Sequence, residues 1–448
     1  MIENKLKTTI LIHAIILLSP ILWLSWYISY DLSKLNKLFF LIPFATYLFI
    51  YVISFYKRFA DTKLVLISIS LIFLFIELVA LIGVKSSYLD SDRFRPVEQF
   101  YLSPYPHFNH KHGSFNSKIG FQWNQQEATV YKYAGEELVF NNTFKGNNYG
   151  FHTAIDFSPK KSPNVKRWIV FGDSFTDGYF LQRTWVDEIN TMYKEDSILV
   201  ELYSFSVNGG GIRNWNQIYH EIIDSNFEFD GVIFAVFGND LKRKFFVLHQ
   251  DEDHELYKYY DDIPSQEEVD LDLKKSLNND LDFMHLFKKE FIYTSKICNY
   301  IFRKFLEKQF HTYYTYNQNA LQNEFIISND TLIINEKYLT DKYQNNFQLF
   351  MELINTIKDQ NKEVVLLSIP ELNGLKMNLK DQKTQIQKEL YWIASQNELT
   401  LIDGYQLMIH SGVKSLDSLY FKNDGHWNQV GSNEFALQFY KKNQFLLN

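Results

Sequence analysis

Three long apolar stretches open the chain, and each is about as long as a membrane-spanning helix. They cover residues 8–30, 38–56 and 64–84 and are separated by short polar linkers. A helix needs about 20 apolar residues to cross the hydrocarbon core of a bilayer. A cleaved signal peptide does not explain the first stretch, because the stretch is too long and no small-residue cleavage site follows it before Asp31. We therefore expect residues 1–85 to form a three-helix transmembrane anchor.

The basic residues that flank these stretches predict their orientation, because cytoplasmic flanks carry an excess of Lys and Arg. With the N-terminus inside, the inner flanks hold five such residues and the outer flanks three: Lys5, Lys7, Lys57, Arg58 and Lys63 against Lys34, Lys37 and Lys85. An odd number of spans then places the rest of the chain outside. We expect a multi-pass protein of the cytoplasmic (inner) membrane whose main domain is extracytoplasmic, or periplasmic.

From Arg167 onward, short apolar runs alternate with helix-like segments. The runs are RWIVF, LVELYSFSV, GVIFAVF, EVVLLSI and LTLID, and each is bounded by turn residues, as is typical of buried parallel strands. The helix-like segments lie at about 184–193, 215–225, 345–361 and 384–397, and a last helix is expected after Asn428. This alternation predicts an α/β domain with an open parallel sheet that helices cover on both faces. Ligands of such sheets bind at the carboxyl ends of the strands.

Two other regions differ from this pattern. Residues 86–165 form a polar lead-in with short strand-like runs, IGFQW and ELVFNNTF, and residues 166–448 form the α/β domain. Residues 241–340 interrupt that domain with a charged stretch, DEDHELYKYYDD, followed by a long helical pattern that includes Cys298. We interpret the charge runs as a solvated face. Three histidines of the lead-in lie close together, but no carboxylate or Cys accompanies them at metal-ligand spacing, so we favour a polar loop over a metal site: His107, His110 and His112.

Composition excludes several classes of protein. With 46% hydrophobic and 17% aromatic residues the chain is not a disordered one, and its one cysteine excludes an intramolecular disulfide framework. Residues 1–85 hold eight Lys and Arg against four Asp and Glu, a balance of +4. Because the net charge of the whole chain is −7, the remaining residues carry −11. A region this acidic is poorly suited to bind nucleic acid, because such binding requires neutralisation of phosphates.

Four short motifs follow predicted strands, where this kind of sheet places its ligands. They are Gly-Asp-Ser-Phe-Thr at 172–176, Val-Asn-Gly-Gly-Gly at 207–211, Phe-Gly-Asn-Asp at 237–240 and Asn-Asp-Gly-His-Trp-Asn at 423–428. A Ser at a strand-to-helix turn can present both its hydroxyl and its backbone N–H, although an ordinary helix cap, made by the Ser or by the Asp before it, would look the same. Glycines and Asn-Asp pairs are also common in turns. A His beside a carboxylate is the general base that a serine nucleophile needs.

In this order, the four motifs resemble the blocks of the SGNH/GDSL hydrolase superfamily over roughly residues 165–445, with the insertion outside the match. The resemblance implies a three-layer α/β/α, flavodoxin-like domain that needs no metal and no cofactor. It implies that Ser174 is the nucleophile and that His426 is the general base. The oxyanion hole would comprise the Ser174 backbone amide, Gly209 and Asn239. The run Asn-Asn-Tyr-Gly-Phe at 147–151 resembles a lead-in found in membrane-linked bacterial members.

Two positions depart from the family pattern. Phe237 stands where the third block usually has Gly, and Asn423 stands where the last block usually has Asp, three residues before the His. Asp424, two residues before His426, resembles the arrangement in members that take part in alginate O-acetylation. We therefore expect Asp424 to orient His426, and a dyad in which a backbone carbonyl holds the His stays open as the alternative.

These features predict a membrane-anchored serine esterase that removes acyl (acetyl) groups from a carbohydrate or envelope glycan through an acyl-enzyme. The alternative is an O-acyltransferase that moves an acetyl group onto an extracytoplasmic polysaccharide. A membrane partner would supply the acyl group. A non-catalytic membrane scaffold is a second alternative, disfavoured because all four motif residues are present. Three tryptophans could stack on sugar rings or belong to the core: Trp123, Trp215 and Trp427.

Overall fold

The computed structural model describes the chain from His107 to Asn443 with several gaps. The described residues are 107–108, 113–134, 137–224, 226–250, 255–280, 341–411, 413, 415–421 and 424–443. The three predicted transmembrane segments, the long helical pattern of the insertion, Cys298 and Asn423 lie outside them. Within the part of the chain that is described, none of the helices combines the length and the apolar character needed to cross a bilayer.

A five-stranded parallel sheet forms the centre of the domain. Its strands are β6 (Lys166–Phe171), β7 (Val200–Ser204), β8 (Gly231–Val236), β11 (Glu363–Ser368) and β12 (Thr400–Asp403), in the spatial order β12-β11-β8-β6-β7. Each coincides with one of the five apolar runs, so these predictions are confirmed. The chain passes from β6 to β7 on one side and then to β8 on the other, which makes the carboxyl end of β6 a switch point where ligands bind in such sheets.

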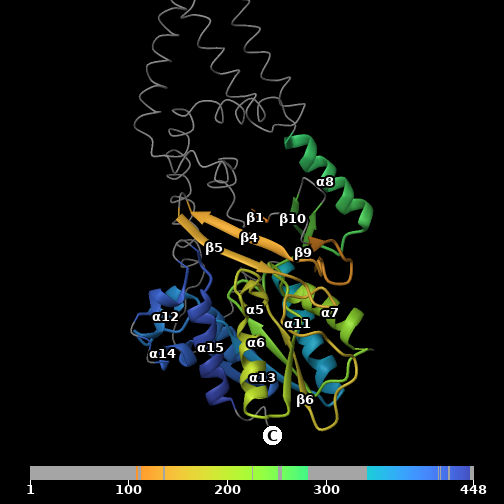
Figure 1. Cartoon of the computed structure of the whole chain (residues 1–448). Helices are drawn as coiled ribbons and strands as arrows, with labels where there is room; N and C mark the ends of the chain where they lie inside the picture. Colours follow the sequence, from red (N-terminus) through yellow and green to blue (C-terminus); the bar gives the residue numbers. More distant parts are fainter. Residues whose placement is uncertain are drawn as a thin grey trace, which may run out of the picture. The chain divides into compact units, whose positions relative to one another are not determined.

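Two groups of helices cover the sheet (Figure 1). Helices α6 (Trp185–Glu195) and α15 (Gln429–Lys442) pack together, while α7 (Ile212–Ile218), α11 (Asp341–Asp359) and α13 (Gln385–Asn397) form the other group. Because parallel crossovers are right-handed, the reversal of direction at β6 puts α6 and α7 on opposite faces. The domain therefore has the expected α/β/α layers. The shorter helical elements are α5 (Ser174–Asp177), η4 (Tyr219–Ile223), α12 (Leu372–Asn378), α14 (Gly404–Ile409) and η5 (Leu416–Leu419).

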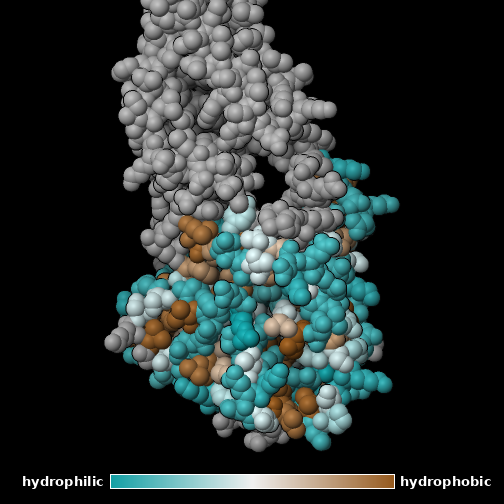
Figure 2. Space-filling view, viewed as in Figure 1, coloured by the Kyte–Doolittle hydropathy of each residue, from teal (hydrophilic) through white to brown (hydrophobic). Residues whose placement is uncertain are grey.

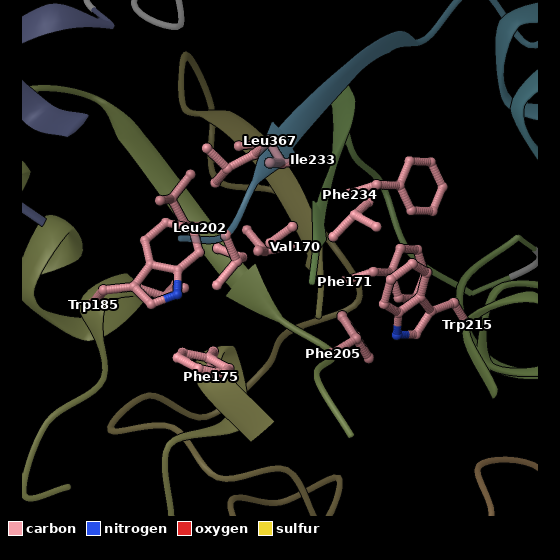
Figure 3. Packing of buried hydrophobic residues seen from close by; sticks show 14 of the residues in the cluster. Val170, Phe171, Phe175, Trp185, Leu202, Phe205, Trp215, Ile233, Phe234 and Leu367 are labelled. Carbon is pink, nitrogen blue, oxygen red and sulfur yellow. The ribbon is translucent and has the colours of Figure 1, made fainter. Parts of the chain in front are cut away.

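The core between these layers combines aliphatic strand residues with aromatic rings (Figure 3). Phe171 and Phe234 from neighbouring strands stack with their ring centroids 5.4 Å apart, and Trp215 lies 6.4 Å from Phe171. Trp123, Trp215 and Trp427 are all buried, with 0–2% of their surface exposed. Of the two alternatives for these tryptophans, their burial therefore supports the core and not stacking on sugar rings.

The lead-in forms strands that join this core. Strands β1 (His107–Phe108), β4 (Ala128–Ala134) and β5 (Glu137–Phe144) make an antiparallel sheet, and β2 (Gly113–Ser114) pairs with β3 (Gln122–Trp123). The run ELVFNNTF is a strand as predicted. In the run IGFQW only the last two residues form a strand, because Gly120 takes a positive φ of 92° in a turn. Phe140 and Phe144 of β5 belong to the same buried cluster as the sheet.

The insertion begins with a hairpin of β9 (Phe245–Gln250) and β10 (Glu255–Tyr260), followed by helix α8 (Gln266–Asp280). Most side chains of β10 are exposed or half-exposed, as expected of a solvated face, but the segment is a strand with one buried residue. Tyrosines favour strands, and Leu256 is buried against a small cluster that includes Phe245 and Val247. Around these elements the visible surface is largely hydrophilic, with small separate hydrophobic patches (Figure 2).

Candidate active site

Ser174 is the first residue of α5, directly after the central strand β6. Of the two residues that could be an ordinary helix cap, Asp173 has that role and Ser174 does not: the Asp173 carboxylate accepts a hydrogen bond from the Phe175 N–H at 3.0 Å. The turn is tight, since a Cβ at Gly172 would lie 2.3 Å from the Thr176 hydroxyl. The Ser174 hydroxyl is therefore presented at the edge of the sheet without a capping bond of its own.

Ser174, His426 and Asp424 form a continuous chain of hydrogen bonds. The Ser174 Oγ lies 2.7 Å from Nε2 of His426, and Nδ1 of His426 lies 2.5 Å from Oδ1 of Asp424. The same Oδ1 accepts the His426 backbone N–H at 2.8 Å. The structure thus brings together the three side chains predicted from the sequence, and the group at His426 Nδ1 is the carboxylate of Asp424 rather than a backbone carbonyl.

Aromatic rings surround the imidazole. The rings of Phe175 and Phe180 lie 4.8 Å and 4.7 Å from that of His426. Phe237, the residue that departs from the family pattern, stacks on Phe175 at 4.5 Å. The departure therefore adds a ring to the apolar wall of the site. His426 nevertheless keeps 27% of its side chain exposed, which leaves it accessible to a substrate.

Asp424 is buried, with 3% of its side chain exposed, and carries a charge partner on its other oxygen. Oδ2 accepts a hydrogen bond from the ammonium group of Lys132 in β4. Burial opposes the charge on Asp424, but Lys132 and His426 outweigh burial and hold the pKa of this carboxyl well below its ordinary range. The carboxylate that faces His426 is therefore ionised at neutral pH.

The two other predicted oxyanion residues follow the strands on either side of β6. Gly209 comes after β7 with a φ of 73°, and its carbonyl accepts a hydrogen bond from the Tyr259 hydroxyl at 3.0 Å. Asn239 comes after β8, and among the described residues its buried Oδ1 has no hydrogen-bond partner. Ser174, Gly209 and Asn239 thus follow three neighbouring strands at one edge of the sheet, as an oxyanion hole would require.

Arg243, which lies outside the four sequence motifs, ties these three loops together. Its Nη1 donates to Asp173 at 3.2 Å, to Asp240 at 3.1 Å and to the Gly210 carbonyl at 2.8 Å. Burial raises the pKa of Asp240 well above its ordinary value, Asp173 raises it further, and Arg243 counteracts both. The guanidinium therefore holds two buried carboxylates near each other and fixes the loops after β6, β7 and β8 relative to one another.

The remaining carboxylates near strand ends have structural partners. Asp403 caps α14 and accepts hydrogen bonds from Gln387, at 3.1 Å and 3.0 Å to its two oxygens. Asp177 accepts one from the indole N–H of Trp123 at 2.9 Å. Within the described residues no group of three or more His, Cys, Asp or Glu side chains is arranged to hold a metal ion.

Comparisons with known proteins give similar structures but no matching family. No family model matches the chain, and no curated protein does. Solved structures similar to it include lipases, acylhydrolases and esterases, among them a GDSL-like lipase and a member of the lipolytic G-D-S-L family. An acetylxylan esterase from Geobacillus stearothermophilus, in a catalytic mutant, is 11% identical with a TM-score of 0.33, covering 64% of this chain and 96% of that chain.

Two further structures are similar to the same degree. An esterase from Pseudoalteromonas is 12% identical with a TM-score of 0.33, and covers 63% of this chain and 100% of that one. A GDSL-like lipase from Bacteroides thetaiotaomicron is 13% identical with a TM-score of 0.31, and covers 65% and 91% respectively. At these identities and TM-scores the likeness supports no conclusion about activity, which has to be argued from the geometry of the site.

Proposed function

We propose that the protein is a serine esterase of the SGNH/GDSL type, which cleaves an acyl ester through an acyl-enzyme. The observation that carries the proposal is the hydrogen-bonded chain from Ser174 through His426 to the ionised Asp424. A nucleophile, a base within hydrogen-bond reach and a carboxylate that orients the base are the parts that acyl transfer by a serine requires.

In the proposed reaction, the Ser174 Oγ attacks the ester carbonyl carbon and its proton passes to Nε2 of His426. Asp424 holds the imidazole by Nδ1 and stabilises the imidazolium that forms. The Ser174 N–H, the Gly209 N–H and the Asn239 side-chain amide would donate to the oxyanion. The tetrahedral intermediate collapses, and the leaving alcohol takes the proton from His426. A water molecule then repeats these steps on the acyl-enzyme, which releases the acid and restores Ser174.

The finer parts of the proposal rest on the sequence. We propose an acetylated carbohydrate or envelope glycan as the substrate and an extracytoplasmic location, supported by the apolar stretches and flanking charges of residues 1–85. An O-acyltransferase would use the same three side chains, and the two activities differ in whether water or a sugar hydroxyl takes the acyl group from Ser174.

Turnover of p-nitrophenyl acetate by the full chain tests the esterase proposal. We expect Ser174→Ala and His426→Ala to reduce turnover to background, and Asp424→Asn to lower kcat by about 10³–10⁴-fold. The matched controls Ser395→Ala and His410→Ala change exposed residues and should keep full activity. A folded chain with no turnover would contradict the proposal. A glycan that becomes acetylated while acetate release falls would identify transfer instead of hydrolysis.

A further inference from the structure

The carboxylate of Asp424 divides its two oxygens between two kinds of partner. Oδ1 accepts both the ring Nδ1–H and the backbone N–H of His426, while Oδ2 accepts from Lys132. The Lys132 side chain is 12% exposed and that of Asp424 is 3% exposed. This is therefore a largely buried ion pair in direct contact with the proposed triad, and not one of the exposed pairs that contribute little.

The fold brings Lys132 to this place through the lead-in hairpin, the strands β4 and β5. The pairing of β4 with β5 shifts between Lys132 and Tyr133, and such an irregularity redirects a side chain. Asn142 of β5 anchors the hairpin, because its side chain donates to the carbonyls of Tyr179 at 2.8 Å and Leu181 at 2.6 Å. These carbonyls belong to the segment that follows the nucleophile helix α5.

Ring contacts anchor the same hairpin to the loop that holds the base. Phe140 of β5 lies 5.5 Å from Phe180 and 5.4 Å from Phe421, measured between ring centroids. The Phe421 backbone N–H in turn donates to the His426 carbonyl at 3.0 Å. The strand that carries Lys132 is thus fixed both to the nucleophile side and to the base side of the site.

We propose that Lys132 is a positioning residue of the triad. Its ammonium group neutralises Oδ2 of Asp424 and so keeps the carboxylate aligned with the imidazole. The charge of Lys132 thereby sets how strongly Asp424 retains the proton on His426. This inference rests on the proposed esterase function and assigns the lead-in hairpin a part in it. Lys132 acts through Asp424 and does not touch the reacting atoms.

The charged groups around the Lys132–Asp424 pair determine whether loss of Lys132 moves the activity of the base to higher or to lower pH. Lys132 from β4 and the hydrogen-bonded His426 lower the pKa of Asp424, and the groups next to the imidazole from α5 and the following loop are the uncharged rings of Phe175 and Phe180. Asp173 lies 3.5 Å from the Ser174 Oγ and is paired with Arg243. Removing the Lys132 charge leaves Asp424 more attractive to a proton on His426, so the base becomes active only at higher pH.

The pH dependence of kcat/KM of the full chain tests this. We expect Lys132→Met and Lys132→Gln to move the acidic limb of the profile upward by about one pH unit, as loss of a nearby charge predicts. At a pH on that limb kcat/KM then falls about tenfold, while KM stays within about twofold because Lys132 does not contact the substrate. Lys132→Arg keeps the charge and should keep the limb of the wild type. Lys118→Met, at an exposed lysine outside the site, is the matched control.

Each outcome separates this inference from the esterase proposal. An active wild type whose acidic limb does not move in Lys132→Met and Lys132→Gln would overturn the role of Lys132 alone. Loss of the folded state in both neutral variants, measured by thermal unfolding, would also overturn it, since Lys132 would then hold the hairpin and not the triad. A folded wild type without turnover would overturn the esterase function, and the positioning role with it.

Discussion

Single residues decide which groups at the site are free to react. Ser174 is available because Asp173 caps α5, and Asp424 stays ionised while buried because it accepts hydrogen bonds from the Lys132 ammonium group and from His426. Asp177, unlike Asp424, is a buried carboxyl whose charge is stabilised by no cation in the described part of the chain. It is buried between the site and the lead-in, and among the described residues its Oδ2 has no hydrogen-bond partner.

Burial is the main cause that raises the pKa of Asp177 to about 8; the hydrogen bond from Trp123 opposes the rise, and the nearby Asp173 adds a smaller contribution in the same direction as burial. The folded protein therefore keeps this proton at pH values where the unfolded chain, with an ordinary Asp, has lost it. From about pH 4 to about pH 8, stability should fall by up to about 1.4 kcal/mol per pH unit because of this one group. We predict that Asp177→Asn makes the fall in Tm between pH 5 and pH 8 shallower.

Thermal unfolding at several pH values measures the effect. Asp359→Asn, at an exposed carboxyl in the last turn of α11, is the control and should follow the wild type. Equal slopes for wild type and Asp177→Asn would show that Asp177 is ionised in the folded protein.

Ser174, His426 and Asp424 could be predicted from the sequence because short motifs encode them. Lys132 and Arg243 could not. Lys132 meets a residue 292 positions away through the pairing and packing of β4, and nothing in its own neighbourhood predicts that contact. Arg243 does have a local signal, since it stands three residues after Asp240, but an isolated Asp–Arg spacing is common in turns and on helices.

At the level of elements, two hairpins frame the residues of the site. The hairpin of β4 and β5 holds Lys132 against Asp424, and the hairpin of β9 and β10 places Tyr259 on the Gly209 carbonyl. The parallel strands could be predicted because each is a continuous apolar run bounded by turns. Strand β10 could not, because its charged neighbours hide the single buried Leu256 in a run of exposed and half-exposed residues.

We predict that Asn142→Ala releases the β4–β5 hairpin from the segment after α5. The variant loses two buried hydrogen bonds, which costs about 1–3 kcal/mol, and leaves the Tyr179 and Leu181 carbonyls without this donor. Tm should fall by several degrees, and esterase turnover should fall with it because Lys132 is no longer held. Asn141→Ala, on the exposed side of the same strand, is the control. Equal behaviour of the two variants would mean that the hairpin is held by its ring contacts alone.

Over the whole molecule, the lead-in and the α/β domain share one core and one site. The boundary expected at residue 165 does not separate them in packing, since Phe140 and Phe144 lie in the same cluster as the sheet. Sequence patterns predicted the layers but not this union, because an antiparallel hairpin carries no local sign of the surface on which it packs. The transmembrane anchor and its orientation stay predictions.

Labelling of the full chain with a serine-directed phosphonate tests whether Ser174 is an activated nucleophile. We expect one adduct per chain, located on Ser174 by peptide mass spectrometry, and a much slower reaction in His426→Ala because the base that activates the hydroxyl is gone. Ser174→Ala should take up no label. A folded wild type that remains unlabelled, or that is labelled at another residue, would contradict the assignment of Ser174 as an activated nucleophile.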